Sequence, residues 1–271
     1  MKYENLTRFD DVEFKRLAGV PRQLFSKMLS ILENAEREKR KSGRPHSLSL
    51  ENQLLLTLNY LRSYRTQIEL SADFGLAESN VNRTIQKVEN ALIHSRQFAL
   101  PKRNQNLTNE GLVIVDVTES QIERPKKTQI NYYSGKKKKH TLKTQVIFNP
   151  ELNQIVSIQI ATGRMHDLTI ARKHAREFAY YRWVMADLAY KGFKEIKSKL
   201  LIPIKKLKNI ELSKEAKQIN REISRCRIPI EHINSKLKIF RIIGERYRNR
   251  RKRFGLRMNL IAGLVNWMIK K

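Results

Sequence analysis

Three acidic residues stand where a divalent cation could use them. Asp116 lies inside the apolar run GLVIVDVTES, where a carboxylate is costly unless it is paired or bound to a metal. Asp187 ends the strand-like stretch RWVMAD, and Glu231 belongs to the helical stretch PIEHINSKLKIF. Clustered carboxylates repel one another and would be partly protonated without a cation. Two divalent ions about 3.5–4 Å apart would turn such a cluster into a clamp for in-line phosphoryl transfer.

The elements that must position these acids follow from hydrophobic periodicity. Strands are expected at GLVIVDVTES, KHTLKTQVIFN, NQIVSIQIATGR, RWVMADLAYKGF and LLIPIKK. One helix, from about Asp167 to Tyr181, is expected after the third strand, another between the last two strands, and a closing helix carries Glu231. This is the order of the ribonuclease-H-like α/β fold, a mixed five-stranded sheet with flanking helices. In that fold the first strand, the fourth strand and the closing helix each bring one acid to a common point.

Each acid also fits a purely structural role. Asp116 could form a turn at a strand end, Asp187 could cap a helix, and Glu231 could be one more solvated acid among basic helices. Asp167, after His166 at a predicted strand-to-helix junction, could cap the helix or lie beside the metals. Only the joint order of the three acids favours catalysis.

The first 100 or so residues predict an all-α region that contains a helix-turn-helix. In TQIELSADFGLAESNVNRTIQKVENALI, Gly75 suits a left-handed turn between two helices. Apolar residues are expected to bury the two helices, namely Ile68, Leu70 and Phe74 in the first and Val81, Ile85, Val88 and Leu92 in the second. Near the start of the second helix, outward-facing Ser79, Asn80 and Arg83 suit base edges in a major groove. An ordinary helical bundle with a solvated polar face is the alternative.

The charge balance indicates a polyanionic partner. The chain has 271 residues, with 55 Lys and Arg against 26 Asp and Glu, for a net charge of +29. Such a balance favours nucleic acid or an acidic membrane surface. A single cysteine, Cys226, excludes an intramolecular disulfide and a thiolate-rich zinc site. No apolar run approaches the roughly 18 residues of a membrane span, and the acidic start MKYENLTRFDD is unlike a signal peptide.

Basic segments outside the helix-turn-helix are candidate DNA contacts. Arg44, in the linker segment GRP, could enter a minor groove or belong to a solvated linker. Lys138 lies in a lysine run on a predicted turn, which could hold DNA backbone or be a solvated hairpin. Arg250 and Arg251 lie in ERYRNRRKRFGLR, and the apolar stretch LIAGLVNWMI after it favours an ordered, DNA-facing helix over a disordered tail.

Several longer motifs carry a family resemblance. They are VDVTES followed by IERPKK, YYSGKKKKHTLKTQV, GRMHDLTI, ADLAYKGF, IPIKK and RCRIPIEHINSKLKIFRIIGERYRNRRKRFGLRMNLIAG. In these the chain resembles bacterial insertion-sequence transposases with the acidic triad abbreviated DDE, in the family named after insertion sequence five. The resemblance implies that Asp116, Asp187 and Glu231 bind two Mg²⁺ or Mn²⁺ ions. Lys238, seven residues after the glutamate, would contact the DNA backbone or stabilise charge.

The expected organisation and activity follow from these readings. Residues 1–45 form a helical segment and linker, 46–105 the helix-turn-helix region, and 106–271 the catalytic domain. The expected partners are double-stranded DNA, as terminal inverted repeats and target, and a second copy in a dimeric synaptic complex, with no membrane. The protein would be cytoplasmic and associated with the nucleoid. Two competing functions are a non-catalytic DNA-binding regulator, including a domesticated transposase, and a metal-dependent nuclease that cuts without strand transfer.

Overall fold

The computed structural model describes residues 2–39, 45–101, 111–207 and 210–270, and divides the chain into two compact units. The helical unit comprises Met1–Ala99, Lys238–Gly244 and Leu256–Met268. The sheet unit comprises Leu100–Leu237, Glu245–Gly255 and Ile269–Lys271. No helix in the described ranges is long and apolar enough to cross a bilayer. The domain boundaries expected at residues 45 and 105 stay a prediction.

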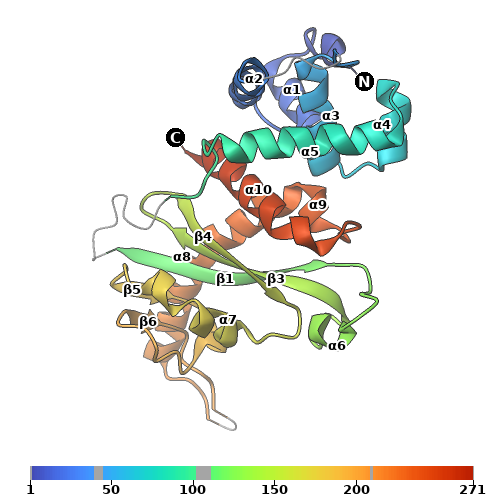
Figure 1. Ribbon diagram of the computed structural model, residues 1–271. Helices are drawn as coiled ribbons and strands as arrows, with labels where there is room; N and C mark the ends of the chain where they lie inside the picture. Colours follow the sequence, from blue (N-terminus) through green and yellow to red (C-terminus); the bar gives the residue numbers. More distant parts are fainter. Residues whose placement is uncertain (1, 40–44, 102–110, 208–209, 271) are drawn as a thin grey trace. The chain divides into compact units, whose positions relative to one another are not determined.

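The helical unit is built around a buried central helix. Its elements are η1 Tyr3–Leu6, α1 Asp11–Ala18, α2 Arg22–Arg37, α3 Leu50–Arg62, α4 Gln67–Phe74, α5 Glu78–His94, α9 Arg241–Gly244 and most of α10 Phe254–Ile269 (Figure 1). Every residue of α3 from Asn52 to Leu61 is buried, so this helix forms the core of the unit. The last helix, α10, is fixed here by a buried ion pair in which Arg257 Nε donates to Glu89 Oε1 at 2.6 Å.

The helix-turn-helix prediction is confirmed in its turn and in most of its core. Gly75 ends α4 in the left-handed region, at φ +66°. The expected apolar side chains of α5 are buried, and Ala77 occupies its N-cap without a side-chain hydrogen bond. Ile68 was expected in the core but is 60% exposed, because Leu70 and Phe74 alone cover the inner face of the short α4.

The sheet unit has the strand order expected of a ribonuclease-H-like fold. Its strands are β1 Leu112–Gln121, β2 Tyr133–Ser134, β3 Lys139–Asn149, β4 Gln154–Thr162, β5 Trp183–Met185 and β6 Lys199–Leu201. β3 pairs antiparallel with both β1 and β4, whereas β5 and β6 continue from β1 in parallel. The sheet therefore reads β4-β3-β1-β5-β6, and the two-residue β2 adds a sixth strand to the expected five.

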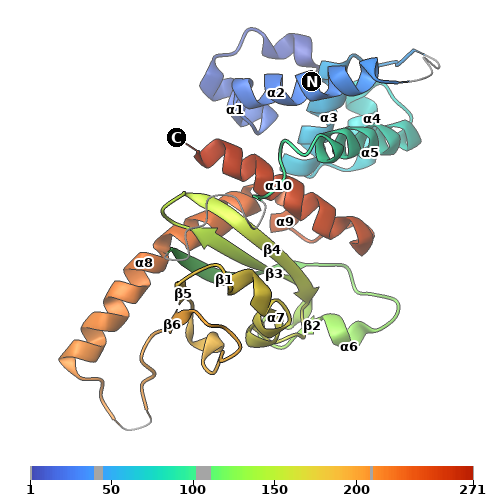
Figure 2. The ribbon, with the colours of Figure 1, turned by 60° about the vertical axis from the view of Figure 1, so that its left-hand side comes forward.

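Different helices cover the two faces of the sheet. Val113 and Val115 of β1 pack in one apolar core with Ala171 of α7 (Asp167–Lys173) and Phe178 of η2 (Ala175–Phe178). Since successive side chains of a strand alternate between faces, Asp116 points to the opposite side, where α8 (Lys214–Ile239) lies. Figure 1 shows α7 in front of the sheet and α8 behind it, and Figure 2 shows the length of α8.

Three expected helices differ from the sequence prediction. The helix expected from Asp167 to Tyr181 breaks after Lys173 into α7 and η2. Between β5 and β6 there is only the short η3 (Leu188–Tyr190) and loop. The basic segment with Arg250 and Arg251 is loop and the short η4 (Arg251–Arg253), because Tyr247 N donates to Gln121 O at 2.8 Å and ties the segment to the end of β1. α6 (Gln129–Tyr132), a single turn after β1, was not expected.

Candidate active site and nucleic-acid interface

The parallel pairing of β1 with β5 brings two of the three predicted acids together. Its register pairs Val113 with Val184 and Ile114 with Met185. Asp116 and Asp187 each lie two residues past this last pair, and the charge of Asp187 acts on the Asp116 carboxyl. The Asp187 side chain also accepts a hydrogen bond from Ala189 N at 2.9 Å, so it caps η3 as well.

Two side chains of α8 hold Asp116 from the other direction. Asn234 Nδ2 donates to Asp116 Oδ2 at 2.8 Å, and Arg227 Nη2 lies 3.7 Å from Asp116 Oδ1. These contacts join positions more than 100 residues apart, and sequence reasoning missed both residues. The sequence did hold a signal for these two residues. Arg227 and Asn234 lie on the same helical stripe as buried Ile230 and Ile233, so they must face the sheet with them.

Glu231 lies on the helix that contacts Asp116, between the two contacting residues. Positions three and four apart share one helical face, and Glu231 comes four residues after Arg227 and three before Asn234. Its side chain is exposed. Within the described residues, no three His, Cys, Asp or Glu side chains are placed to hold a metal ion together. Pro229 lies inside α8 two residues before Glu231, where it removes one backbone hydrogen bond of the helix.

The chemistry around Asp116 fits a divalent cation. Burial raises the pKa of the Asp116 carboxyl, Arg227 opposes this shift, and the charges of Asp187 and Asp167 add to it. Asn234 Oδ1 and Arg227 Nε are buried without a hydrogen-bond partner in the described part of the chain. Carboxylate and amide oxygens are the ligands that Mg²⁺ and Mn²⁺ prefer. A cation here would add to the charge of Arg227 in neutralising the Asp116 and Asp187 carboxylates.

Asp167 lies near this pair but has a different partner. Lys143 Nζ donates to Asp167 Oδ1 at 2.7 Å. The N-cap of α7 is His166, without a side-chain hydrogen bond, so the capping role considered for Asp167 is not observed. The charges of these acids act on buried Tyr190, and burial together with these charges raises its pKa well above the usual value.

The start of α5 presents the predicted base-reading side chains to solvent. Ser79, Asn80 and Arg83 are all exposed. Arg83 Nη1 donates to Asn80 Oδ1 at 3.0 Å, which orients the guanidinium along the helix. These two residues also line a groove of about 910 Å³ between α5 and the segment from Pro45 to Leu48.

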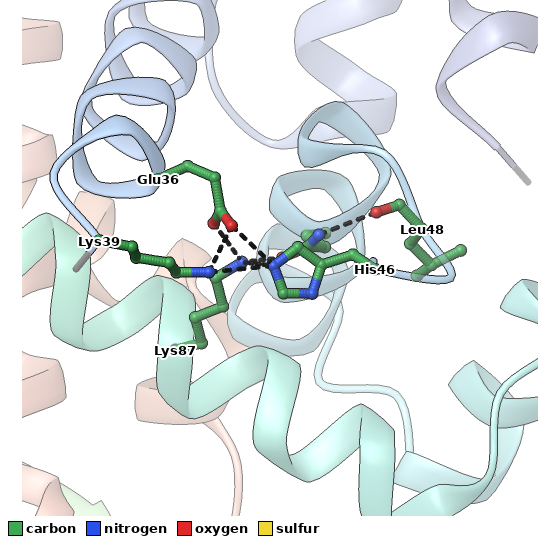
Figure 3. Close-up of polar contacts among 6 residues, drawn as sticks. Glu36, Lys39, His46, Leu48 and Lys87 are labelled. Carbon is green, nitrogen blue, oxygen red and sulfur yellow. Dashed lines mark hydrogen bonds and ion pairs between the residues drawn. The ribbon is translucent and has the colours of Figure 1, made fainter. Parts of the chain in front are cut away.

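An ion network fixes α5 to the rest of the helical unit (Figure 3). The Glu36 carboxylate of α2 accepts a hydrogen bond from Lys87 Nζ of α5 at 3.0 Å, and it also contacts Lys39 and His46. Lys87 Nζ donates in addition to Gln53 Oε1 at 3.0 Å. Burial raises the pKa of Glu36, but the hydrogen bonds from Lys39, Lys87 and His46 outweigh it and lower the pKa to about 2. Lys87 is therefore a structural residue of the helical unit.

The remaining predicted DNA contacts that the structure describes are exposed on the surface. Lys138 is exposed on the turn before β3, at φ +51°. Arg250 and Arg251 are exposed, and the Arg251 guanidinium lies 4.4 Å from the centre of the Tyr132 ring. Lys238 is exposed two turns after Glu231 in α8. Arg44 lies outside the described residues.

Comparison with known proteins agrees with this arrangement. Residues 115–266 match the family described as DDE superfamily endonuclease, and residues 46–98 match the helix-turn-helix of DDE superfamily endonuclease. The chain is 44% identical over 270 residues to a probable transposase for insertion sequence element IS702 from Microchaete diplosiphon. That similarity covers 98% of each of the two chains.

Proposed function

The chain belongs to the DDE superfamily of endonucleases, and on this premise we propose that it moves an insertion sequence by binding the element ends, cutting them and joining them to target DNA. The proposal includes membership of the insertion-sequence-five family. The observation that supports it most is that Asp116 and Asp187 each follow, by two residues, the paired positions Ile114 and Met185 of neighbouring parallel strands.

Divalent metal dependence follows from the superfamily, and the residues of the site suggest how the ions are held. Asp116, Asp187 and Glu231 would bind two Mg²⁺ or Mn²⁺ ions, Glu231 after a shift of its side chain or of α8. Bound ions would activate the attacking oxygen and stabilise the leaving oxygen of a phosphodiester. Carboxylate oxygens in a partly buried cluster suit this role.

The chain's own side chains orient the reaction. Asn234 and Arg227, both on α8, hold the carboxylate of Asp116 in β1. Lys238 would contact the backbone of the scissile DNA strand. In the first step a water oxygen bonds to phosphorus and the bond to the 3′ oxygen breaks, which leaves a 3′-hydroxyl and a 5′-phosphate. In the second step that 3′-hydroxyl attacks a target phosphodiester, and one new 3′-hydroxyl leaves as one phosphodiester forms.

Recognition would be divided between the two units. Ser79, Asn80 and Arg83 at the start of α5 would read bases of the terminal inverted repeats in the major groove. Arg44 would enter a minor groove, while Lys138, Arg250 and Arg251 would contact phosphates. The functional assembly would be a dimer that joins two element ends, acting in the bacterial cytoplasm at the nucleoid.

A strand-joining assay separates this function from its two competitors. The purified protein is incubated in Mg²⁺ or Mn²⁺ with its element end, either intact or pre-cut, and with a plasmid target. Cutting and joining are expected for a transposase. Cutting without joining of the pre-cut end would indicate a nuclease, and specific binding with neither reaction would indicate a regulator.

A further inference from the structure

A cation-lined cleft of about 1020 Å³ opens in the sheet unit beyond the end of β1. Two segments form its rim, 123–127 after β1 and 248–252 before α10. The rim carries seven basic side chains and one acid, Glu123. The basic side chains are Arg124, Lys126, Lys127, Arg248, Arg250, Arg251 and Lys252.

Most of this charge is not neutralised by the protein. Among the described residues, Lys126, Lys127, Arg250 and Lys252 form no ion pair with a carboxylate. Arg124 Nε donates to a neutral acceptor, Gln129 Oε1, at 2.8 Å. A surface with this much unpaired positive charge favours a polyanion with several phosphates.

The floor of the cleft is apolar and aromatic, which a duplex backbone alone does not require. Ile122, Leu142 and Ile160 line it, together with Pro125 and the Tyr132 ring. Duplex DNA presents phosphates and sugars to the outside and keeps the faces of its bases stacked. An unpaired nucleotide presents a base face, which stacks on aromatic rings and guanidinium planes.

The aromatic side of the cleft is held in place by the backbone. A Cβ at Gly163 would come within 2.5 Å of Tyr132 O and 2.3 Å of Thr141 Oγ1, so only glycine lets the α6 turn lie this close to the sheet. Arg164 N also donates to Asn131 O at 3.2 Å. Tyr132 and the Arg251 guanidinium over its ring therefore form a stacking surface fixed in advance.

The register of the sheet relates the cleft to the acids. Leu142 pairs with Ser120 of β1, and Ser120 lies on the same face as Asp116 because it is an even number of residues away. From Asp116 in β1 to Ile122, which follows the end of β1 at the edge of the cleft, the extended chain spans about 20 Å at roughly 3.3 Å per residue. In DNA, roughly six nucleotides of a duplex strand span that distance.

We propose that this cleft binds an unpaired stretch of DNA about six nucleotides from the cleavage site, with one base stacked on the Arg251–Tyr132 pair and its phosphates against Arg124, Arg250 and Lys252. The proposal rests on the proposed function, since it takes DNA as the substrate, and it goes further by assigning a single-stranded segment to a named cleft.

The test compares two DNAs of equal duplex length, one blunt and one with a single-stranded dT overhang that contains 2-aminopurine. Binding by the full chain is followed by fluorescence anisotropy without divalent metal, so that no cleavage occurs. We expect the overhang DNA to bind roughly tenfold more tightly, with quenching of 2-aminopurine by stacking. Equal affinity and no quenching would overturn the proposal.

Variants assign the effect to the cleft. Tyr132→Ala should remove the overhang preference and the quenching while blunt binding stays unchanged, and Tyr132→Phe should keep both. Tyr133→Ala is the matched control, because Tyr133 is the exposed neighbour, contacts the His140 ring edge-on and does not line the cleft. If Tyr132→Ala fails to fold, the exposed residue Lys252 replaces it as Lys252→Ala, which should lower overhang binding several-fold more than blunt binding.

The outcome is distinguishable from failure of the proposed function. A protein that binds and cuts its blunt element end but shows no overhang preference leaves the transposase proposal intact and removes this one. Loss of preference in Tyr133→Ala to the same extent as in Tyr132→Ala would also contradict the cleft assignment.

Discussion

Asp116 lies two residues past Ile114 in β1, and Asp187 lies two residues past Met185, the residue that pairs with Ile114 at the end of β5. Strand pairing thus brings the two acids near each other, and the charge of Asp187 acts on the Asp116 carboxyl. The third acid, Glu231, depends instead on α8, which reaches Asp116 through Arg227 and Asn234.

Replacing Asp116 should separate catalysis from binding. Asp116→Ala is expected to lower cleavage and joining on the order of 10³-fold or more, because a carboxylate ligand of the metal is lost. Binding of the element end should persist or tighten, since one repulsion with phosphate is removed. Gel-based cleavage and mobility-shift assays on the same preparation measure both. Joining by Asp116→Ala at the wild-type rate would remove Asp116 from the mechanism.

Replacing Asn234 should disturb the site without removing a proposed ligand. Asn234→Ala deletes the 2.8 Å hydrogen bond to Asp116, and loss of such an orienting partner typically costs about 10–100-fold in metal affinity or activity. We expect the Mn²⁺ concentration for half-maximal cleavage to rise, and direct Mn²⁺ binding measured by electron paramagnetic resonance to weaken in parallel. Lys236→Ala, an exposed change on the same helix, is the control and should match the wild type.

Replacing Arg83 tests base reading by α5. If the guanidinium contacts a base edge, Arg83→Ala should lose about 1–3 kcal/mol of discrimination between the terminal repeat and random DNA. Competition binding at fixed salt gives both affinities. Arg16→Ala, which removes an exposed arginine of α1, controls for net charge. An equal loss on specific and random DNA would make Arg83 a phosphate contact instead.

The Glu36 network predicts an acid dependence of stability in the helical unit. The folded pKa of about 2 lies below the ordinary value of 4.5, so the stabilisation is fully present above pH 4.5 and is lost as the pH falls toward 2. With screening of this partly exposed group, we expect Glu36→Gln to cost about 1–2 kcal/mol at pH 7. The free-energy difference from wild type should shrink steadily below pH 4.5.

Urea unfolding followed by circular dichroism between pH 7 and pH 3 measures this difference. Glu38→Gln serves as the control, because Glu38 is exposed at the end of the same helix. A Glu36→Gln deficit that stays constant with pH would show that the network does not stabilise through the charge of Glu36.

The sequence by itself determined the elements whose pattern is local. The predicted strand KHTLKTQVIFN coincides with β3, Lys139–Asn149. Its pattern of apolar side chains lies within a few neighbouring residues and can therefore be recognised in the sequence alone. Gly75 marked the turn of the helix-turn-helix, since only a residue without a Cβ enters the left-handed region freely. The motifs also placed Asp116 within a strand and Asp187 at the end of another, and β5, which ends two residues before Asp187, is the parallel neighbour of β1.

The tertiary structure alone decided how polar groups are partnered and where weak helices stop. Asn234 and Arg227 reach Asp116, and Lys87 reaches Glu36, across long stretches of chain. Periodicity reports which face of an element is buried, but a hydrogen bond depends on a distance in space that no local pattern encodes. A contact in space also explains why the basic segment before α10 is not the helix that was expected. Tyr247 pairs with the end of β1, and this pairing exists only in the folded chain.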